Sequence, residues 1–347
     1  MTTGSVRGSR LSRLAGLARW QKVMLALVAV FAVLCATLVT LGLGARHRYE
    51  SRVQREDILG DGAPGRDERR WAEGPLNLLL LGSDSRDGEP DQGTYPGQRS
   101  DAIMVVHLNA ARDTATVVSI PRDSYVDVPA REGSWNGGPN KINAAFAFGG
   151  AALAAETVHR LTRVPLDGVL VANFAAVRSI VDAVGGITVC LPHEVASVTT
   201  GARWPVGCHR LDGPAADDLV RQRHDVPGGD FGRILDQQLV VRAIAEQVTS
   251  GNLLANPAKL DRLLTTAAEA LTVDRDLDLT DLALAVRRIR PETLRFVTVP
   301  VADPAVDTPA GSAVRLDDRL AADLFTAVRD DTVDRWLADN PQAVTVN

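Results

Sequence analysis

Aromatic side chains are scarce, since Phe, Trp and Tyr together make up 4% of the 347 residues. Single-stranded nucleic acids are bound largely by stacking on such rings, so this composition argues against a single-strand binding surface. The sequence also contains no Gly-rich nucleotide-binding loop ending in Lys-Ser or Lys-Thr, no His-Glu-x-x-His and no Gly-x-Ser-x-Gly. The sequence therefore gives no support for the commonest nucleoside triphosphatase, zinc peptidase and serine hydrolase classes.

Residues 1–22 carry a net positive charge, whereas the rest of the chain is acidic overall. The formal net charge is −5, but residues 1–22 contain five basic residues and no acidic one, so the remainder carries about −10. DNA and RNA are polyanions that are bound mainly through Lys and Arg, and an acidic body repels them. We therefore expect no nucleic-acid partner.

Charge is absent altogether from residues 23–45. A helix of that length spans the hydrocarbon core of a bilayer, about 30 Å thick, so the run predicts a transmembrane signal-anchor helix. A cleavable signal peptide is the alternative, but its apolar region is usually only about 7–15 residues long. The basic tail precedes the run, so the positive-inside rule predicts a single-pass cell-membrane protein with a cytoplasmic amino terminus and an extracytoplasmic body.

Cysteine is also rare, and only three residues are present. Cys35 lies in the predicted span, which leaves Cys190 and Cys208 to form a disulfide in an oxidising compartment. Two alternatives stay open from the sequence. One is a pair of buried thiols, and the other is a zinc site with His193 and His209, although adjacent Cys208 and His209 have poor chelate geometry.

The remaining sequence divides into a solvated segment and one folded domain. Residues 46–75 are rich in Arg, Glu, Asp and Gly without a sustained apolar period, and they predict an extracytoplasmic stalk after the tail (1–22) and the anchor (23–45). The domain is expected at 76–340. Short apolar runs of strand length alternate there with helical patterns, which is typical of an α/β fold with a central mixed sheet covered by helices on both faces, a three-layer sandwich. Strands are expected at 77–81, 102–108, 115–120, 168–173, 187–191 and 294–299, and helices at 141–163, 174–184, 214–221, 233–250, 259–271, 280–289 and 317–328.

Acidic and basic residues gather at the predicted ends of the first three strands. Asp84 follows the first strand, and Arg99 and Asp101 precede the second. If these strands are neighbours, the two carboxylates converge, and paired carboxylates with open positions suit Mg²⁺, or Mn²⁺ in its place. Arg122 and Asp123 follow the third strand, and Lys141 opens the next predicted helix, where the helix dipole favours an anion. Solvated loop charges and a surface ion pair are the structural alternatives for these residues.

A second basic cluster comes later, around a Gly-rich turn. In extended chain Arg221 and Arg223 point to one face, and Asp230 is placed to cap a helix in which Arg233 and Gln237 stand one turn apart. Arginine presents a planar fork of donors that fits phosphate oxygens, so the cluster predicts a phosphate-rich ligand. In the structural alternative, these arginines tie the helix to the acids of the domain itself.

In their order and spacing, these motifs resemble the LytR-CpsA-Psr family of cell-wall glycopolymer ligases. The resemblance covers about residues 76–299. The motifs are Leu-Leu-Gly-Ser-Asp84, Arg99-Ser-Asp101, Ser-Ile-Pro-Arg122-Asp123, Lys141-Ile-Asn143, Val184-Gly-Gly-Ile-Thr-Val189, Arg221-Gln-Arg223 and Gly-Asp230-Phe-Gly-Arg233 with Gln237.

The resemblance implies a membrane-embedded phosphotransferase that moves an anionic glycopolymer from a polyprenyl pyrophosphate carrier to peptidoglycan through a phosphodiester, usually at the six-hydroxyl of a muramic acid. It implies that Asp84 and Asp101 hold magnesium and that an apolar groove between sheet and helices takes the prenyl tail. It also implies pyrophosphate contacts from Arg99, Arg122, Arg221, Arg223, Arg233 and Gln237. Lys141 is expected to join this set, and Asp84 or Asp123 to accept the proton of the attacking hydroxyl.

The sequence departs from the family pattern at two points. Asp236 stands where many relatives have a further arginine, and the loop between Asp84 and Arg99 is long. We expect no accessory domain after the core. Two other functions fit the same residues, namely a polyprenyl pyrophosphatase, in which water replaces the sugar hydroxyl, and a non-catalytic lipid-binding regulator whose basic tail binds anionic headgroups.

Overall fold

The computed structural model describes residues 51–60, 71, 73–83, 100–222, 227–249 and 256–346, and all elements given below belong to the unit Arg52–Asn347. The predicted tail, the predicted span at 23–45 and Cys35 lie outside the described residues. Within the described part of the chain, no helix has the length and apolar character needed to cross a membrane.

A mixed sheet forms the centre of the fold, as the sequence predicts. Within the described residues it has eight strands in the order β1-β12-β7-β2-β3-β4-β13-β16. The first predicted strand pairs antiparallel with the second and parallel with β7, while β4 pairs antiparallel with β3 and parallel with β13. The strands of this sheet are β1 (Gln54–Glu56), β2 (Leu76–Ser83), β3 (Ser100–Leu108), β4 (Ala115–Ser119), β7 (Gly168–Asn173), β12 (Leu271–Asp274), β13 (Leu294–Thr298) and β16 (Val344–Val346).

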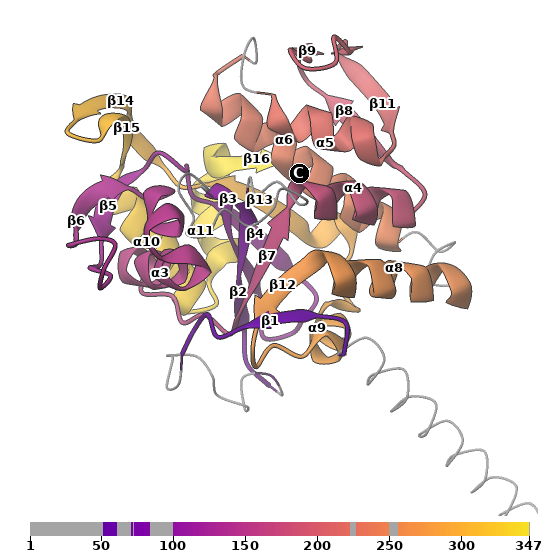
Figure 1. Ribbon diagram of the computed structural model, residues 1–347, viewed down its shortest axis with the longest axis horizontal. Helices are drawn as coiled ribbons and strands as arrows, with labels where there is room; N and C mark the ends of the chain where they lie inside the picture. The colour runs from indigo at the N-terminus through magenta and orange to yellow at the C-terminus, as the bar shows by residue number, and fades with distance from the viewer. Residues whose placement is uncertain are drawn as a thin grey trace, which may run out of the picture. The chain divides into compact units, whose positions relative to one another are not determined.

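Helices and four small two-stranded sheets surround this centre in the described part of the chain (Figure 1). The helices are α3 (Ala144–Thr162), α4 (Phe174–Ala183), α5 (Gly213–Arg221), α6 (Asp230–Thr249), α8 (Pro257–Ala270), α9 (Leu279–Val286), α10 (Asp318–Arg329) and α11 (Val333–Asp339), with short 3-10 turns at Pro291–Thr293 and Pro341–Ala343. The smaller sheets pair β5 (Tyr125–Val128) with β6 (Gly138–Lys141), β8 (Ile187–Leu191) with β11 (Gly207–Leu211), β9 (Val195–Ala196) with β10 (Arg203–Trp204), and β14 (Val301–Thr308) with β15 (Gly311–Leu316).

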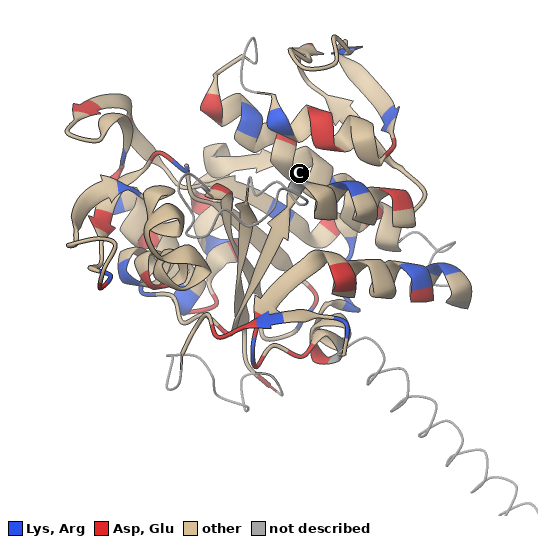
Figure 2. Ribbon diagram, viewed as in Figure 1, with Lys and Arg blue, Asp and Glu red and all other residues tan. Residues whose placement is uncertain are grey.

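Both faces of the central sheet are buried, because successive side chains of a strand point to opposite faces. In β3, Ile103 and Val105 pack in a cluster with α3, α10 and α11, while Met104 and Leu108 pack in another with residues of α6 and α9. Charged residues lie mainly on the helices and loops, and the central strands are almost free of them (Figure 2). Charges that belong to a site are therefore expected at the ends of the strands.

Two strands of the central sheet come from outside residues 76–340, the expected domain. Residues 54–56, which the sequence predicts as stalk, form β1 and pair with β12 in parallel register. At the other end, β16 follows residue 340 and pairs with β13. Both strands are three residues long and lie at the edges of the sheet, so neither has the apolar run that marks a buried strand.

The expected start of the first helix is wrong. Lys141 is the last residue of β6, where it pairs with Tyr125, and α3 begins at Ala144. The preceding segment is drawn into a hairpin because Gly138 and Pro139 pair with β5. Lys141 therefore lies in a strand and does not open the helix.

The predicted disulfide is confirmed, since Cys190 and Cys208 are bonded and face each other across the β8–β11 ladder. The bridge spans 18 positions of sequence. A loop of that length gives a stabilisation of roughly 3 kcal/mol in the chain-entropy description. Zinc requires thiolates as ligands, so the disulfide excludes the alternative zinc site with His193 and His209.

Candidate functional site

The carboxyl-terminal ends of β2, β4, β7 and β13 meet at one edge of the sheet, together with the beginning of β3. In α/β folds this edge is the usual place for a ligand site. Ser83 pairs there with Ser100 after a shift in register, and Asp101 occupies the irregular position beside them. The prediction that the first two strands are neighbours is confirmed. Asp84 and Arg99, which adjoin these residues in sequence, lie outside the described residues.

Asp101 is buried, with 6% of its surface exposed, and it binds an arginine from the turn after the neighbouring strand β4. The Arg122 guanidinium donates from Nη1 to Asp101 Oδ1 at 2.5 Å. Arg122 lies in the turn after β4. Its backbone carbonyl accepts a hydrogen bond from the backbone N–H of Asn143, which helps to fix its position. The structure thus brings Arg122 and Asp101, which the sequence predicts as site residues, into direct contact.

Arg122 also binds Asp230, the first residue of α6. Its Nε donates to Asp230 Oδ1 at 3.1 Å, and Arg233 Nη2 lies 2.5 Å from that same oxygen. Arg233 is almost fully buried, with 1% exposed. Asp101, Arg122, Asp230 and Arg233 therefore form a continuous series of contacts, which we call the charge network. It joins the start of β3, the exit of β4 and the start of α6.

Burial and charge act in opposite directions on Arg122. Burial lowers the pKa of the Arg122 guanidinium, but the negative charges of Asp230, Asp101 and Asp123 raise it, and the net result is a pKa above the ordinary value for arginine. The guanidinium therefore stays charged at every accessible pH. A permanent cation held between two carboxylates is oriented before any ligand arrives.

Asp123 and Lys141 form a second group beside the network. Asp123 Oδ1 accepts a hydrogen bond from the Asn143 side chain at 3.1 Å, and it lies 3.9 Å from Lys141 Nζ and 4.0 Å from Arg122 Nε. The structure thus brings Asp123 and Lys141 to the network, as the sequence predicts. Asn143 holds the carboxylate of Asp123 in place instead of capping α3.

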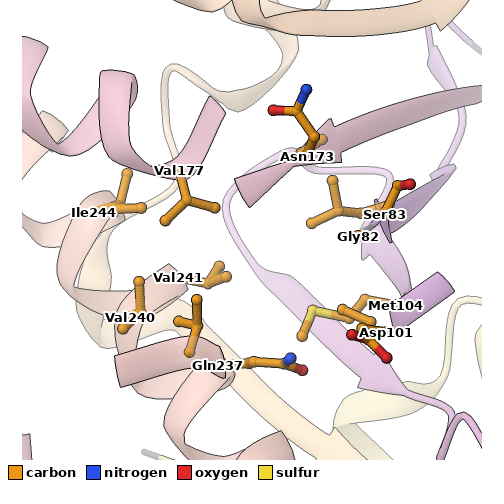
Figure 3. A pocket seen from close by; sticks show the side chains of 14 residues that line it. Gly82, Ser83, Asp101, Met104, Asn173, Val177, Gln237, Val240, Val241 and Ile244 are labelled. Atoms are coloured by element: carbon orange, nitrogen blue, oxygen red, sulfur yellow. The ribbon is translucent and has the colours of Figure 1, made fainter. Parts of the chain in front are cut away.

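An apolar pocket opens beside Asp101, between the sheet and the helices α4, α5 and α6 (Figure 3). The empty space at its mouth and inside it, open solvent included, is about 590 Å³. Gln237, with 7% exposed, is among the few polar residues of the lining, and it lies on the α6 side of the pocket. The lining residues are Leu80, Gly82, Ser83, Asp101, Ala102, Met104, Ala172, Asn173, Val177, Val220, Gln237, Val240, Val241 and Ile244.

The structure places Arg221 differently from the prediction. Arg221 is the last residue of α5 and is not in extended chain, and its Nε donates to Asp217 Oδ1 at 2.5 Å within the same helix. Arg178 of α4 donates to the other oxygen of Asp217, so these residues tie α4 to α5. Arg223 lies outside the described residues.

Asp236 is fully buried in α6, with 0% exposed. Burial raises the pKa of its carboxyl to about 6, although the nearby His193 partly offsets the rise. His193 Nε2 lies 3.2 Å from Asp236 Oδ1. The carboxyl follows Arg233 by one turn, so the segment carries one buried cation and one acid that is partly protonated near neutral pH.

Asp236→Asn is expected to change how stability depends on pH. The folded pKa of Asp236 is about 6, against an ordinary value of 3.8. A raised pKa means that the fold favours the protonated form, so its stabilising contribution is complete below about pH 4 and is lost as the pH rises through about 6. Above that pH the buried charge costs the fold up to about 3 kcal/mol, and the neutral Asn side chain removes this cost.

The check is the free energy of unfolding in denaturant, measured at pH 4.5 and pH 7.5 on the purified protein in detergent. The stability of Asp236→Asn relative to wild type should rise between the two pH values. The exposed Asp323→Asn on α10 serves as the control and should show no such change. An equal effect of Asp236→Asn at both pH values would rule out the raised pKa.

Some residues of the site are missed or misassigned by sequence reasoning. Asp230 is predicted as a helix cap, but its carboxylate joins Arg122 to Arg233. The signal that could have found this role is the acid in the motif Gly-Asp-Phe-Gly-Arg, three residues before the arginine. Ser83 and Asn173 are not predicted at all, and they enter the site because the parallel pairing of β2 and β7 sets them side by side.

Comparisons with known proteins identify the family of the chain. The chain matches the LytR_cpsA_psr family over residues 47–323. It is 35% identical over 205 residues to the polyisoprenyl-teichoic acid–peptidoglycan teichoic acid transferase TagU of Enterococcus faecalis, covering 59% of this chain and 63% of that protein. It is 30% identical over 312 residues to the cell wall biosynthesis protein LcpA of Corynebacterium glutamicum, covering 79% of this chain and 59% of that protein. The matches thus span about three fifths of the length of these curated relatives.

Solved structures have the same fold. The LytR-Csp2A-Psr enzyme from Actinomyces oris superimposes with a TM-score of 0.61 at 23% identity, covering 80% of this chain and 96% of that chain. TagT bound to LIIa-WTA superimposes with a TM-score of 0.58 at 25% identity, again covering 80% and 96%. The mixed sheet with its helices is therefore an architecture that proteins of divergent sequence share.

Proposed function

Because this chain belongs to the LytR_cpsA_psr family, we propose that it is a phosphotransferase that joins an anionic glycopolymer to peptidoglycan. The donor is a glycopolymer on a polyprenyl pyrophosphate carrier, and the product is a phosphodiester. The names of TagU and LcpA support transfer to the cell wall, since the first is named a teichoic acid transferase and the second a cell wall biosynthesis protein.

The observation that carries the proposal is the position of the charge network at the apolar pocket. Asp101 belongs to both, since it binds Arg122 and also lines the pocket. A prenyl pyrophosphate has the matching two parts, an apolar chain and a doubly charged head. The chain would lie among Val177, Val240 and Ile244, and the head would lie at Arg122.

The reaction needs positioning and charge neutralisation more than covalent help from the protein. The hydroxyl oxygen of the acceptor attacks the phosphorus that carries the glycopolymer, the bond to the bridging pyrophosphate oxygen breaks, and prenyl monophosphate leaves with that oxygen. Arg122 binds the phosphoryl oxygens on which negative charge accumulates, and Asp101 and Asp230 fix its orientation. Asp123 and Asp84 are the candidates to accept the proton of the hydroxyl.

Magnesium is the proposed cofactor, with manganese as an alternative. The described part of the predicted ligand pair fits it, because Asp101 is a buried carboxylate at the strand end and hard cations prefer carboxylate oxygens. Asp101 and Asp84 would hold the ion, and Asp84 lies outside the described residues. When bound, the ion would supply positive charge to the pyrophosphate oxygens.

Residues 23–45 are proposed to anchor the protein in the cell membrane, with the fold on the outer side. This placement would tether the domain to a membrane that contains the prenyl carrier. The supporting observations are the uncharged run in the sequence and the disulfide, which is typical of exported domains.

The test is product analysis by mass spectrometry. The full-length protein in detergent is incubated with a prenyl-pyrophosphate glycopolymer and Mg²⁺, with and without soluble peptidoglycan. A phosphodiester conjugate that appears only with peptidoglycan supports the transferase. Release of prenyl monophosphate at the same rate with and without peptidoglycan, and no conjugate, would instead identify a hydrolase. No turnover of the lipid would leave lipid binding as the function.

A further inference from the structure

A second cleft lies at the same strand ends, on the opposite face of the sheet from the apolar pocket. The two hollows share Ser83 and Asn173, which are partners across the β2–β7 ladder. The apolar pocket contains Ala172 of β7, whereas the second cleft contains Val171, the adjacent residue that points to the other face. The strand ends therefore have one hollow on each side.

The second cleft is polar where the first is apolar. Its walls come from β1, β12, α4 and α8, and α4 packs beside α8 there (Figure 1). Hydroxyl, amide and carboxylate groups line it, and none of the described lining residues is basic. The polar residues of the lining are Gln54, Glu56, Ser83, Asn173, Ser179, Thr266, Glu269 and Thr272.

The sign of the charge in the cleft distinguishes between the two substrates of the proposed reaction. Glu56 and Glu269 are exposed carboxylates in the lining, and Glu269 is paired with Arg52 at its outer side. An anionic glycopolymer would be repelled by Glu56, while a glycan with hydroxyl and acetamido groups would find acceptors in the carboxylates and both donors and acceptors in the hydroxyls and amides. The cleft thus suits an uncharged polyhydroxyl chain.

We propose that this cleft, which we call the acceptor cleft, binds the glycan strand of peptidoglycan. The inference rests on the proposed transferase function and adds the place where the acceptor lies. The hydroxyl would reach the pyrophosphate at the boundary formed by Ser83 and Asn173, from the face opposite to the prenyl chain. Substrates that enter from opposite faces can meet at the strand ends without crossing, which suits a displacement in which the attacking and leaving oxygens lie on opposite sides of the phosphorus.

A bulky side chain in the acceptor cleft tests the inference. Ser179 is exposed on α4 and lines the cleft, so Ser179→Trp should fill the space without disturbing the core. In the full-length protein, this variant should raise the KM for soluble peptidoglycan about tenfold or more and leave the KM for the lipid donor within about twofold. Thr266→Trp, on the α8 wall, is a second variant and should act in the same direction.

The matched control is Ser312→Trp, which adds the same ring to an exposed position of the β14–β15 hairpin. It should change neither KM. A direct readout is titration of a soluble fragment of alternating N-acetylglucosamine and N-acetylmuramic acid, with each lactyl carboxyl converted to its amide, into the protein without donor, followed by NMR. Binding should weaken in Ser179→Trp and persist in Ser312→Trp.

The outcomes separate this inference from the proposed function. Absence of any conjugate from wild-type protein would contradict the transferase itself. Normal conjugate formation with an unchanged peptidoglycan KM in both Ser179→Trp and Thr266→Trp would overturn the acceptor cleft alone. A rise in the donor KM with no change for peptidoglycan would also overturn it, because the cleft would then hold the sugars of the donor.

Discussion

Arg122→Ala is expected to lower kcat/KM for glycopolymer transfer about 10²–10³-fold, the usual loss when an oriented donor is removed from a developing negative charge. Arg122 is the central cation of the charge network, held by Asp101 at 2.5 Å and by Asp230 at 3.1 Å. Without it, Asp101 loses this guanidinium and Asp230 keeps only Arg233 of the two arginines that hold it. Initial rates of conjugate formation by the full-length protein measure the loss.

Two further variants make the Arg122 result specific. Arg122→Lys keeps the charge but loses the planar fork, so it should restore only part of the activity. Arg319→Ala removes an exposed arginine of α10 that pairs with Asp323, and it should leave the rate within about twofold. If Arg122→Ala folds normally and keeps more than a third of the wild-type kcat/KM, the assignment of Arg122 to the phosphoryl group is wrong.

Arg233→Ala is expected to lower the free energy of unfolding by about 3–5 kcal/mol, as is usual when one partner of a buried ion pair is removed. The side chain is 1% exposed and pairs with Asp230, so its loss leaves a cavity and a partly buried carboxylate with one cation fewer. Thermal or denaturant unfolding in detergent measures the effect, and transfer activity should fall as well because Asp230 also positions Arg122.

The control for Arg233 lies on the same helix. Arg242 pairs with Glu246 one turn further along α6, and that pair is more exposed. Arg242→Ala should therefore lower the unfolding free energy by less than about 1 kcal/mol. Equal losses in the two variants would show that burial of Arg233 contributes no special stability.

The central part of the fold was predictable because its pattern is local. The apolar runs at 77–81, 102–108 and 115–120 became β2, β3 and β4, and the Gly185-Gly186 turn ends the helix before β8 as expected, with φ of 84° and 87°. Those positive angles favour glycine, so the turn can be read directly from sequence. The contact between Asp101 and Arg122 follows from the antiparallel pairing of β3 and β4.

The parts that could not be predicted depend on contacts between distant segments. β1 pairs with β12 more than 200 positions away, and nothing in three polar residues signals such a partner. Lys141 was misplaced because the β5–β6 hairpin competes with the helix that its sequence favours. Asp230 has the composition of a helix cap, and only the exit of β4 beside it turns it into the link between Arg122 and Arg233.

Arg233 is the member of the arginine cluster that reaches the charge network, and it pairs with Asp230 inside α6. Arg122, from the loop after β4, binds the same carboxylate and so ties α6 to the sheet. Asp101, which lines the apolar pocket, binds the guanidinium of Arg122. Asp230 then links Arg122 to the second guanidinium, that of Arg233. We infer that the acids hold the arginines in position for the anion.

The most direct test of the account is a crystal structure of the protein with farnesyl pyrophosphate. The pyrophosphate should lie within hydrogen-bonding distance of Arg122. The prenyl chain should lie in the apolar pocket, between the sheet and Val177, Val240 and Ile244. A pyrophosphate bound away from the charge network, or a prenyl chain outside that pocket, would contradict it.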